Sequence, residues 1–561
     1  MEVKYEKKLK KPWEKYYNKN KKIKGINASA YEFLVQNNQD NLNSMAINYF
    51  NNKLTFEGFF KEIDLCAKAF KSNGIRSGDI ISICMTNTPE AIISFYAINK
   101  IGAIANMIHP LSAEEEIKKS LIETNSVMII AVNVAYKKIK NILKDTNIYK
   151  TIIVSPNNSM PLLLKIGYKI KDNSQISNNS NIIKWNKFML SGKTYNSKVS
   201  VKRHKDDVCV ILHSGGTTGT PKNIQLTNGN INALAKQSHI VLPTMGKGDN
   251  FLSIMPLFHC FGLVVSVHCP LTGKSGITLV PKFDSKRFDK LITSYNPSII
   301  AGVPTLYEAM ITNKNMNKVD LSNIKIVLSG GDTLSIEKNK EINNFLKEHG
   351  CKSKITQGYG LTETSGPVAF STEMGSIGIP LPSNNIKIVN PYTHEDVKFN
   401  EVGEIIVSGP TVMKGYLDND KETKAALEID NEKKIWVHTG DLGRMTKDGT
   451  LIFEQRMKRM LVVSGYNVYP SHIEEILLKH PYIESCGIIG IPHPYKIQVP
   501  KAFIVLKSNI KITNKVKKDI SDYCEKNLAK YMIPKEFVYK ESLPKTIIGK
   551  INYLELEKEA Y

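Results

Sequence analysis

Segments with helical spacing alternate with short apolar segments along most of this chain, and this alternation limits the folds it can adopt. Residues 55–74 (TFEGFFKEIDLCAKAFKSNG) carry apolar residues at helical spacing and end on a glycine. Residues 79–85 (DIISICM) have the character of a buried strand, and a further helix is expected from Pro89, a residue suited to a first helical turn. The alternation predicts an α/β fold with a largely parallel sheet.

The chain has 561 residues, too many for one ordinary core, so we expect two or more domains. From about 375 to 455, short strands are separated by Gly, Asp and Pro turns, and an α/β pattern returns after residue 456. Residues 156–200 include the polar stretch DNSQISNNSN and are expected to form a surface insertion or linker. The preceding segment MPLLLKIGYKI could be a packed helix or lie on a membrane surface.

The net charge is +23, but it comes mostly from scattered lysines, and only six basic residues are arginines. Nucleic-acid sites favour the bidentate arginine fork, so no nucleic-acid partner is expected. The eight cysteines lack CxxC pairs, which indicates reduced thiols and a cytoplasmic protein. No apolar run approaches the roughly 18 residues of a membrane span. The basic N-terminal segment is either a solvated arm or a peripheral contact with anionic lipid at the inner membrane surface.

A glycine- and threonine-rich loop follows an apolar strand at residues 208–223, VCVILHSGGTTGTPKN. Glycines allow backbone N–H groups to converge on an anion, threonines add donors, and Lys222 adds charge. The Walker spacing fails because Pro221 precedes Lys222 and Asn223 follows it. The loop therefore predicts phosphate binding outside the Walker class.

SGGTTGTPKN resembles the signature loop of the AMP-forming adenylate-forming superfamily, which contains acyl-CoA synthetases, luciferases and peptide-synthetase adenylation domains. Nine later segments are similar to its motifs and stand in the same order: PLFHCFG, GVPTL, SGGDTL, QGYGLTET, GSIGIPLP, GEIIVSGP, WVHTGDLGRM, RMKRMLVVSGYNVYP and LPKTIIGK. The resemblance spans residues 214–550 and is closest to medium- and long-chain fatty acyl-CoA synthetases. It implies a large N-terminal α/β domain (1–456) with a small β-barrel subdomain (about 375–455), hinged to a small mobile α+β domain (457–561).

The resemblance also implies the nucleotide contacts. ATP β- and γ-phosphates would be held by the signature loop, the α-phosphate by Thr362, and Mg²⁺ by Glu363, an oxygen donor that suits this cation. The remaining expected contacts are these: Thr217, Thr218, Gly219 and Lys222 to phosphate; Gly330, Gly331, Asp332, Tyr359 and Gly360 to adenine; Asp441 and Arg456 to ribose.

Lys550 matches the family's catalytic lysine, which would act as a fixed cation between carboxylate and α-phosphate. Lys458 occupies the hinge position, which implies two poses of the small domain. In the second pose the loop 464–470, with Gly465 and Tyr466, would line a tunnel for CoA. His259 either borders the carboxylate pocket or is a satisfied core histidine.

Several residues depart from the family pattern, and they bear chiefly on the acceptor: Gly215, Asn223, Gln455, His472, Ile497 and Gln498. The leading hypothesis is ATP-dependent activation of a carboxylic acid, a fatty acid by resemblance, and its transfer to CoA. Loading of an acyl carrier protein and a catalytically silent nucleotide-binding homologue are the alternatives. Monomer and homodimer both remain open.

Overall fold

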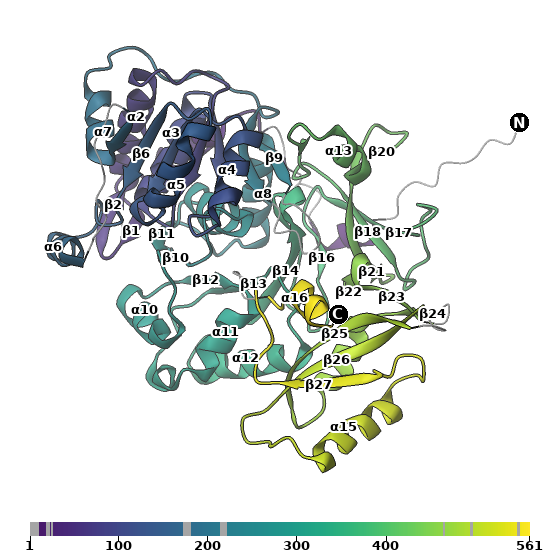
Figure 1. The fold of residues 1–561 in the computed structure, drawn as a ribbon. Helices are drawn as coiled ribbons and strands as arrows, with labels where there is room; N and C mark the ends of the chain where they lie inside the picture. The colour runs from purple at the N-terminus through teal and green to yellow at the C-terminus, as the bar shows by residue number, and fades with distance from the viewer. Residues whose placement is uncertain are drawn as a thin grey trace, which may run out of the picture.

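The computed structural model describes residues 11–17, 23, 26–171, 181–213, 222–463, 466–493, 497–546 and 550–560. Four sheets organise these residues: two large ones built from strands between residues 45 and 416, a β-rich sheet, and a C-terminal sheet (Figure 1). The expected α/β architecture, with a large N-terminal and a small C-terminal part, is confirmed.

The first large sheet has the order β19-β9-β8-β4-β3-β5-β6-β7 and is parallel from β8 to β7. Its strands are β3 (Ile80–Cys84), β4 (Ile104–Met107), β5 (Met128–Val132), β6 (Lys150–Val154), β7 (Ile182–Lys184), β8 (Val208–His213), β9 (Asn223–Thr227) and β19 (Gly415–Tyr416). The helices along this part of the chain are α1 (Ala30–Asn37), α2 (Phe56–Ser72), α3 (Pro89–Lys100), α4 (Glu114–Glu123), α5 (Tyr136–Ile142), α6 (Leu162–Lys171), α7 (Trp185–Lys193), α8 (Asn228–Val241) and α9 (Cys269–Thr272). The helices and strand expected near residues 55–100 are present as α2, β3 and α3.

The second large sheet has the order β16-β15-β14-β13-β12-β10-β11-β1-β2. Its strands are β1 (Met45–Tyr49), β2 (Asn52–Thr55), β10 (Asn250–Ser253), β11 (Gly276–Leu279), β12 (Ile299–Gly302), β13 (Ile326–Gly330), β14 (Ile355–Leu361), β15 (Gly366–Ser371) and β16 (Ile379–Pro380). The helices α10 (Phe288–Tyr295), α11 (Pro304–Thr312) and α12 (Ile336–Glu348) accompany it. One apolar core takes side chains from both large sheets and from α2, α3 and α8.

The β-rich sheet pairs in the order β17-β18-β21-β20, with β22 against β21, and every pairing is antiparallel. Its elements are β17 (Asn385–Val389), β18 (Gly403–Ser408), α13 (Asp420–Ala426), β20 (Leu427–Ile429), β21 (Ile435–Met445) and β22 (Leu451–Arg456). The C-terminal sheet, order β24-β23-β26-β25 with β27 against β26, has a core of its own. Its elements are β23 (Leu461–Val463), β24 (Tyr466–Val468), α14 (Pro470–Leu478), β25 (Ile483–His493), β26 (Ile497–Leu506), α15 (Asn514–Asn527), β27 (Glu536–Lys540) and α16 (Tyr553–Ala560).

The expectation that residues 156–200 form a surface insertion or linker is wrong for part of the segment. Residues 182–184 add β7 to the edge of the first sheet, and α7 packs on α2 through Phe188, whose buried ring meets the Phe70 ring edge-on at 5.0 Å. The preceding helix, α6, does not pack as a core helix, because Leu162 and Leu163 are 72% and 84% exposed. The polar stretch 172–180 lies outside the described residues.

All eight cysteines are buried and unpaired. Among the described residues, no helix combines the length and the apolar character needed to cross a bilayer.

Candidate active site

Asp441 lies near the middle of β21, beside Arg456 at the end of β22, because these two residues are register partners. The Asp441 side chain is almost completely buried, and its Oδ2 accepts a 2.8 Å hydrogen bond from the hydroxyl of Tyr359 on β14. Arg456 Nε is 2.8 Å from Oδ1, yet that oxygen accepts no aligned hydrogen bond within the described part of the chain. Burial raises the pKa of Asp441, and Arg456 and Tyr359 oppose this rise. A buried carboxylate oxygen without an aligned donor suits a ligand hydroxyl.

Glu363 follows β14 in the short 3-10 helix Thr362–Thr364, and its Oε1 accepts a 3.1 Å hydrogen bond from the Tyr416 hydroxyl. Lys222 reaches the same tyrosine from the other side, with its Nζ 4.6 Å from the Tyr416 ring centroid. Its ammonium also donates a 2.6 Å hydrogen bond to Glu422. Tyr416 therefore joins the expected metal ligand to the expected phosphate-binding lysine.

Lys550 enters this region from the C-terminal segment. Burial lowers the pKa of its ammonium, while Asp332 and Asp441 act in the opposite direction and Arg456 adds to the lowering. The same ammonium acts electrostatically on His259, which lies far earlier in the chain. The structure thus brings Lys550 together with Asp332, which follows β13, and with residues of β21 and β22.

His259 precedes Phe261–His268, a buried π-helix of the kind often found at functional sites. Its Nδ1 accepts a 3.2 Å hydrogen bond from the Phe261 backbone N–H, and burial lowers its pKa to about 4. The ring is therefore neutral near pH 7. The adjacent Cys260 thiol lies 3.6 Å from Thr362 Oγ1, and burial raises the pKa of that thiol to about 11.

Two expected glycines occupy positions that other residues would strain. A Cβ on Gly360 would lie 1.9 Å from the Gly366 carbonyl oxygen, because β14 and β15 pair closely there. Gly331, directly after β13, has a φ of +83°, in the left-handed region that favours glycine. Gly330 ends β13, and the Asp332 carboxylate accepts a hydrogen bond from the Thr333 N–H.

The described residues do not include every expected contact. Thr217, Thr218, Gly219 and Gly465 lie outside the described residues, and Tyr466 is described only as part of β24. Lys458 lies in the 3-10 helix Met457–Arg459, between β22 and the C-terminal sheet, and interacts electrostatically with Glu422.

Sequence reasoning missed Tyr416, Glu422 and Cys260. Cys260 lies in the quoted segment PLFHCFG beside His259, but its neighbour Thr362 is 102 residues away. Tyr416 and Glu422 follow the segment GEIIVSGP in the sequence KGYLDNDKE, which on its own is typical of a turn and a helix start. No local signal marked their contacts with Glu363 and Lys222.

Comparison with known proteins decides the family. Residues 34–417, more than half of the chain, match the model of the AMP-binding enzyme family, and residues 472–550 match its C-terminal domain. The chain belongs to the AMP-binding enzyme family. It is an adenylate-forming acid–thiol ligase.

Similar proteins cover nearly the whole chain. The chain is 31% identical to a long-chain-fatty-acid–CoA ligase of Bacillus subtilis, over 90% of each chain. It is 28% identical to a 4-coumarate–CoA ligase of Narcissus pseudonarcissus, over 89% of this chain and 88% of that protein. The fold matches the crystal structure of the anthranilate CoA ligase AuaEII with anthranoyl-AMP, with a TM-score of 0.83, 23% identity and coverage of 96% and 98%.

Proposed function

We propose that this enzyme activates a fatty acid with ATP, giving acyl-AMP and pyrophosphate, and then transfers the acyl group to CoA, giving acyl-CoA and AMP. One observation carries the adenylation step: Lys550 of the C-terminal segment interacts with Asp332 and Asp441 of the large domain. The similarity to a long-chain-fatty-acid–CoA ligase over 90% of the chain supports the substrate and the acceptor.

The nucleoside is held, in this proposal, by Asp441 and Tyr359. A ribose hydroxyl would donate to Asp441 Oδ1, the oxygen that lacks an aligned donor, while the Tyr359 hydroxyl keeps Oδ2 in place. Arg456, half-exposed at 2.8 Å from Oδ1, keeps the carboxylate charged and oriented. The Gly330–Asp332 backbone would lie along the edge of adenine, with Gly360 close to the base.

Glu363 is the proposed Mg²⁺ ligand. Magnesium in phosphate-transfer sites is commonly bound through one or two carboxylates together with substrate phosphates, and one Glu363 oxygen is oriented by Tyr416. A bound Mg²⁺ would neutralise the charge of the phosphates. Lys222, Thr217, Thr218 and Gly219 would hold the pyrophosphate that leaves, and the Thr362 hydroxyl would bond the α-phosphate.

Lys550 has the properties of an electrostatic catalyst. Attack of a carboxylate on the α-phosphorus concentrates negative charge, and a positioned ammonium in a partly desolvated site stabilises that charge more than water does. Burial lowers the pKa of Lys550, and its carboxylate neighbours Asp332 and Asp441 oppose this shift and so favour the protonated ammonium.

Thioester formation requires a second arrangement of the same site. We place the domain boundary between residues 456 and 457, with Lys458 as the hinge, so that residues 457–561 rotate against 1–456. Lys550 would leave, and the loop containing Gly465 and Tyr466 would line the path of the CoA thiol.

The acid site is assigned to the region of His259. A neutral imidazole beside a buried π-helix rich in valine adds no charge to these apolar surroundings, which suits an acyl chain. The similarity to 4-coumarate–CoA ligases makes aryl acids the main competing substrates.

An acid panel tests this proposal. Carboxylate-dependent exchange of labelled pyrophosphate into ATP is measured with fatty acids of increasing length and with coumarate, benzoate and anthranilate, and then CoA or an acyl carrier protein is added. The proposal expects the highest kcat/KM with a fatty acid and acyl transfer to CoA. A higher kcat/KM with an aryl acid would contradict the proposed fatty-acid substrate. Transfer only to the carrier protein would contradict CoA as the acceptor. Absence of exchange with every acid would indicate a catalytically silent homologue.

A peripheral membrane contact through α6 is also proposed. Leu162, Leu163, Leu164 and Ile166 are 72%, 84%, 47% and 53% exposed, and α6 stands at the edge of the molecule (Figure 1). The helix sequence also contains three lysines, which favour anionic lipid.

Sedimentation with phosphatidylglycerol–phosphatidylcholine vesicles tests the contact. Leu163→Glu should reduce vesicle binding, whereas Leu190→Glu, at an exposed leucine (56%) on α7, should not. Equal binding by wild type and Leu163→Glu would exclude α6 as the contact.

A further inference from the structure

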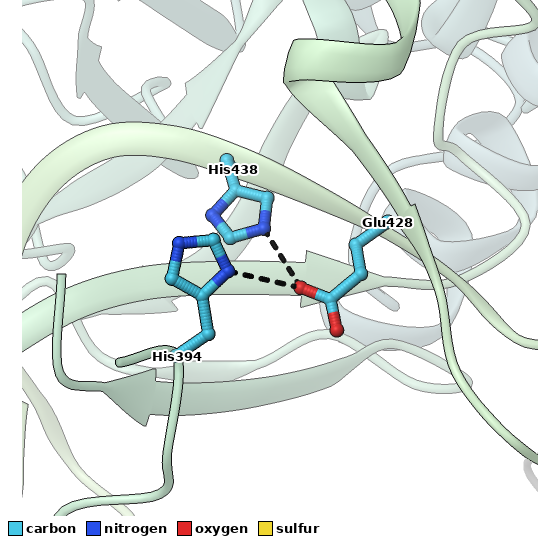
Figure 2. Close-up of side chains that lie close together, drawn as sticks. All are labelled: His394, Glu428 and His438. Atoms are coloured by element: carbon cyan, nitrogen blue, oxygen red, sulfur yellow. Dashed lines mark hydrogen bonds and ion pairs between the residues drawn. The ribbon is translucent and has the colours of Figure 1, made fainter. Parts of the chain in front are cut away.

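Two histidines and a glutamate, none of them assigned to catalysis, converge on the β-rich sheet (Figure 2). His394 lies after β17, Glu428 in β20 and His438 in β21. Glu428 Oε2 is 3.0 Å from His438 Nε2 and 3.5 Å from His394 Nδ1. Three potential ligand atoms, one from each residue, all lie within 4.8 Å of one another.

A fourth residue, Glu404 on β18, orients the buried histidine. Its Oε2 lies 2.9 Å from His438 Nδ1, and its Oε1 accepts a 3.0 Å hydrogen bond from the Gly440 N–H. The carboxylate side chain is only 5% exposed, so it is held in place by the sheet. With Nδ1–H donating to Glu404, the Nε2 lone pair of His438 points toward Glu428.

That arrangement needs a cation. A lone pair on Nε2 and a carboxylate oxygen 3.0 Å apart repel each other unless a proton or a metal ion lies between them. His394 Nδ1 faces the same Glu428 oxygen. A second proton on His438 can satisfy its contact with Glu428, whereas a metal ion engages the facing atoms of all three residues at once.

We propose that His394, Glu428 and His438 bind a divalent transition-metal ion, with Zn²⁺ the best match. Two imidazoles and one carboxylate, with water in the fourth position, form a known zinc ligand set. Metal–ligand bonds of about 2.0–2.1 Å in a tetrahedron separate neighbouring ligands by about 3.3 Å. The separations of 3.0 and 3.5 Å lie on either side of that value, and all three atoms lie within 4.8 Å of one another, so rotations of the side chains can complete the site.

The surroundings of the cluster also fit a metal site. A carboxylate behind a metal-bound histidine is the usual arrangement in zinc proteins, and Glu404 occupies that position for His438. His394 and Glu428 are 51% and 44% exposed, which gives an ion access from solvent. Imidazole ligands select this site against Mg²⁺, which prefers oxygen ligands and is assigned to Glu363.

The position of the site connects it to the nucleotide. Glu404 holds both the proposed metal ligand His438 and the backbone N–H of Gly440, the neighbour of Asp441. Gly440 has a φ of +66°, so the turn before Asp441 depends on a backbone conformation that few residues adopt. A bound metal ion would therefore order the strand segment that presents Asp441.

Zn²⁺ titration of the full-length, chelator-stripped enzyme against a chromophoric zinc chelator tests the proposal. The wild type should bind one equivalent of Zn²⁺. His394→Asn and Glu428→Gln should each weaken Zn²⁺ binding by at least about tenfold, because even the loss of a residue that only orients a metal ligand lowers metal affinity by about that factor. Asparagine is chosen because His394 has a φ of +57°, a conformation that asparagine tolerates. Co²⁺ substitution should give the visible absorption of a four-coordinate site in the wild type and not in either variant.

His204→Ala is the matched control, because His204 is 54% exposed and lies 3.0 Å from Asp206 but belongs to no group of three potential metal ligands among the residues that the structure describes. The buried cysteines do not compete in the folded protein. Thermal unfolding of the metal-free proteins checks that each variant folds. The proposal is overturned if the wild type does not bind one equivalent of Zn²⁺, or if both variants bind Zn²⁺ as well as the wild type does. A protonated His438 would then explain the contacts within the cluster. Neither outcome touches the ligase assignment, which is tested by the acid panel.

Discussion

Replacing Lys550 with alanine should separate the two half-reactions of this enzyme. The Lys550 side chain is partly buried and interacts electrostatically with Asp332, Asp441 and His259, so it reaches the centre of the site in the arrangement the structure shows. Removing one positioned electrostatic donor from such a site costs about 2.7–4 kcal/mol of transition-state stabilisation, or about 10²–10³-fold in rate. Lys550→Ala should therefore lose that much adenylation activity and retain most of its transfer from supplied acyl-AMP to CoA.

Two assays separate these steps. Pyrophosphate exchange reports adenylation, and single-turnover reaction of purified acyl-AMP with CoA reports thioester formation. Lys558→Ala, which removes an exposed lysine from α16 close in sequence, is the matched control and should affect neither step. The reasoning is refuted if Lys550→Ala adenylates normally, or if both half-reactions fall by the same factor while the thermal unfolding temperature is unchanged.

The lowered pKa of Lys550 predicts how the rate of adenylation depends on pH. Lys550 acts while protonated, and burial lowers its pKa below the ordinary lysine value. Adenylation should therefore decline as the pH rises through this lowered pKa, at a lower pH than an exposed lysine would give. Lys550→Arg should shift or abolish this alkaline decline, because arginine stays protonated throughout.

Three further outcomes concern stability. Gly360→Ala should destabilise the protein by about 1–3 kcal/mol or more, because its Cβ would lie 1.9 Å from the Gly366 carbonyl oxygen; urea unfolding measures this. Tyr359→Phe removes the hydrogen bond to the buried Asp441 and should cost about 1.5–3 kcal/mol in the same assay, or an equivalent loss of ATP affinity. Burial lowers the pKa of His268 to about 3, so the unfolded chain binds a proton below about pH 6.5 and the folded chain does not. The stability contributed by neutral His268 should therefore fall by about 2 kcal/mol between about pH 6.5 and pH 5, and His268→Gln should flatten this slope. A variant with the wild-type slope would show that His268 does not titrate as described.

Local sequence patterns were sufficient to predict much of the fold. Apolar spacing and the Gly74 stop located α2, and Pro89 marked the start of α3, because these signals act within one or two helical turns. The polar stretch DNSQISNNSN led to the wrong prediction for residues 182–193, since β7 and α7 gain their stability from an edge of the sheet and from α2 rather than from their own sequence.

The sequence by itself determined the family and the order of its motifs, and through them the residues expected to meet ATP. Tertiary structure decided which side chains come together: Tyr416 with Glu363, Lys550 with Asp332. It also brought His394, Glu428 and His438 to one face of the β-rich sheet. Each histidine alone is indistinguishable in sequence from a surface or core residue. Their proximity depends on strand order and register, which are set by long-range pairing and not by any short stretch of residues.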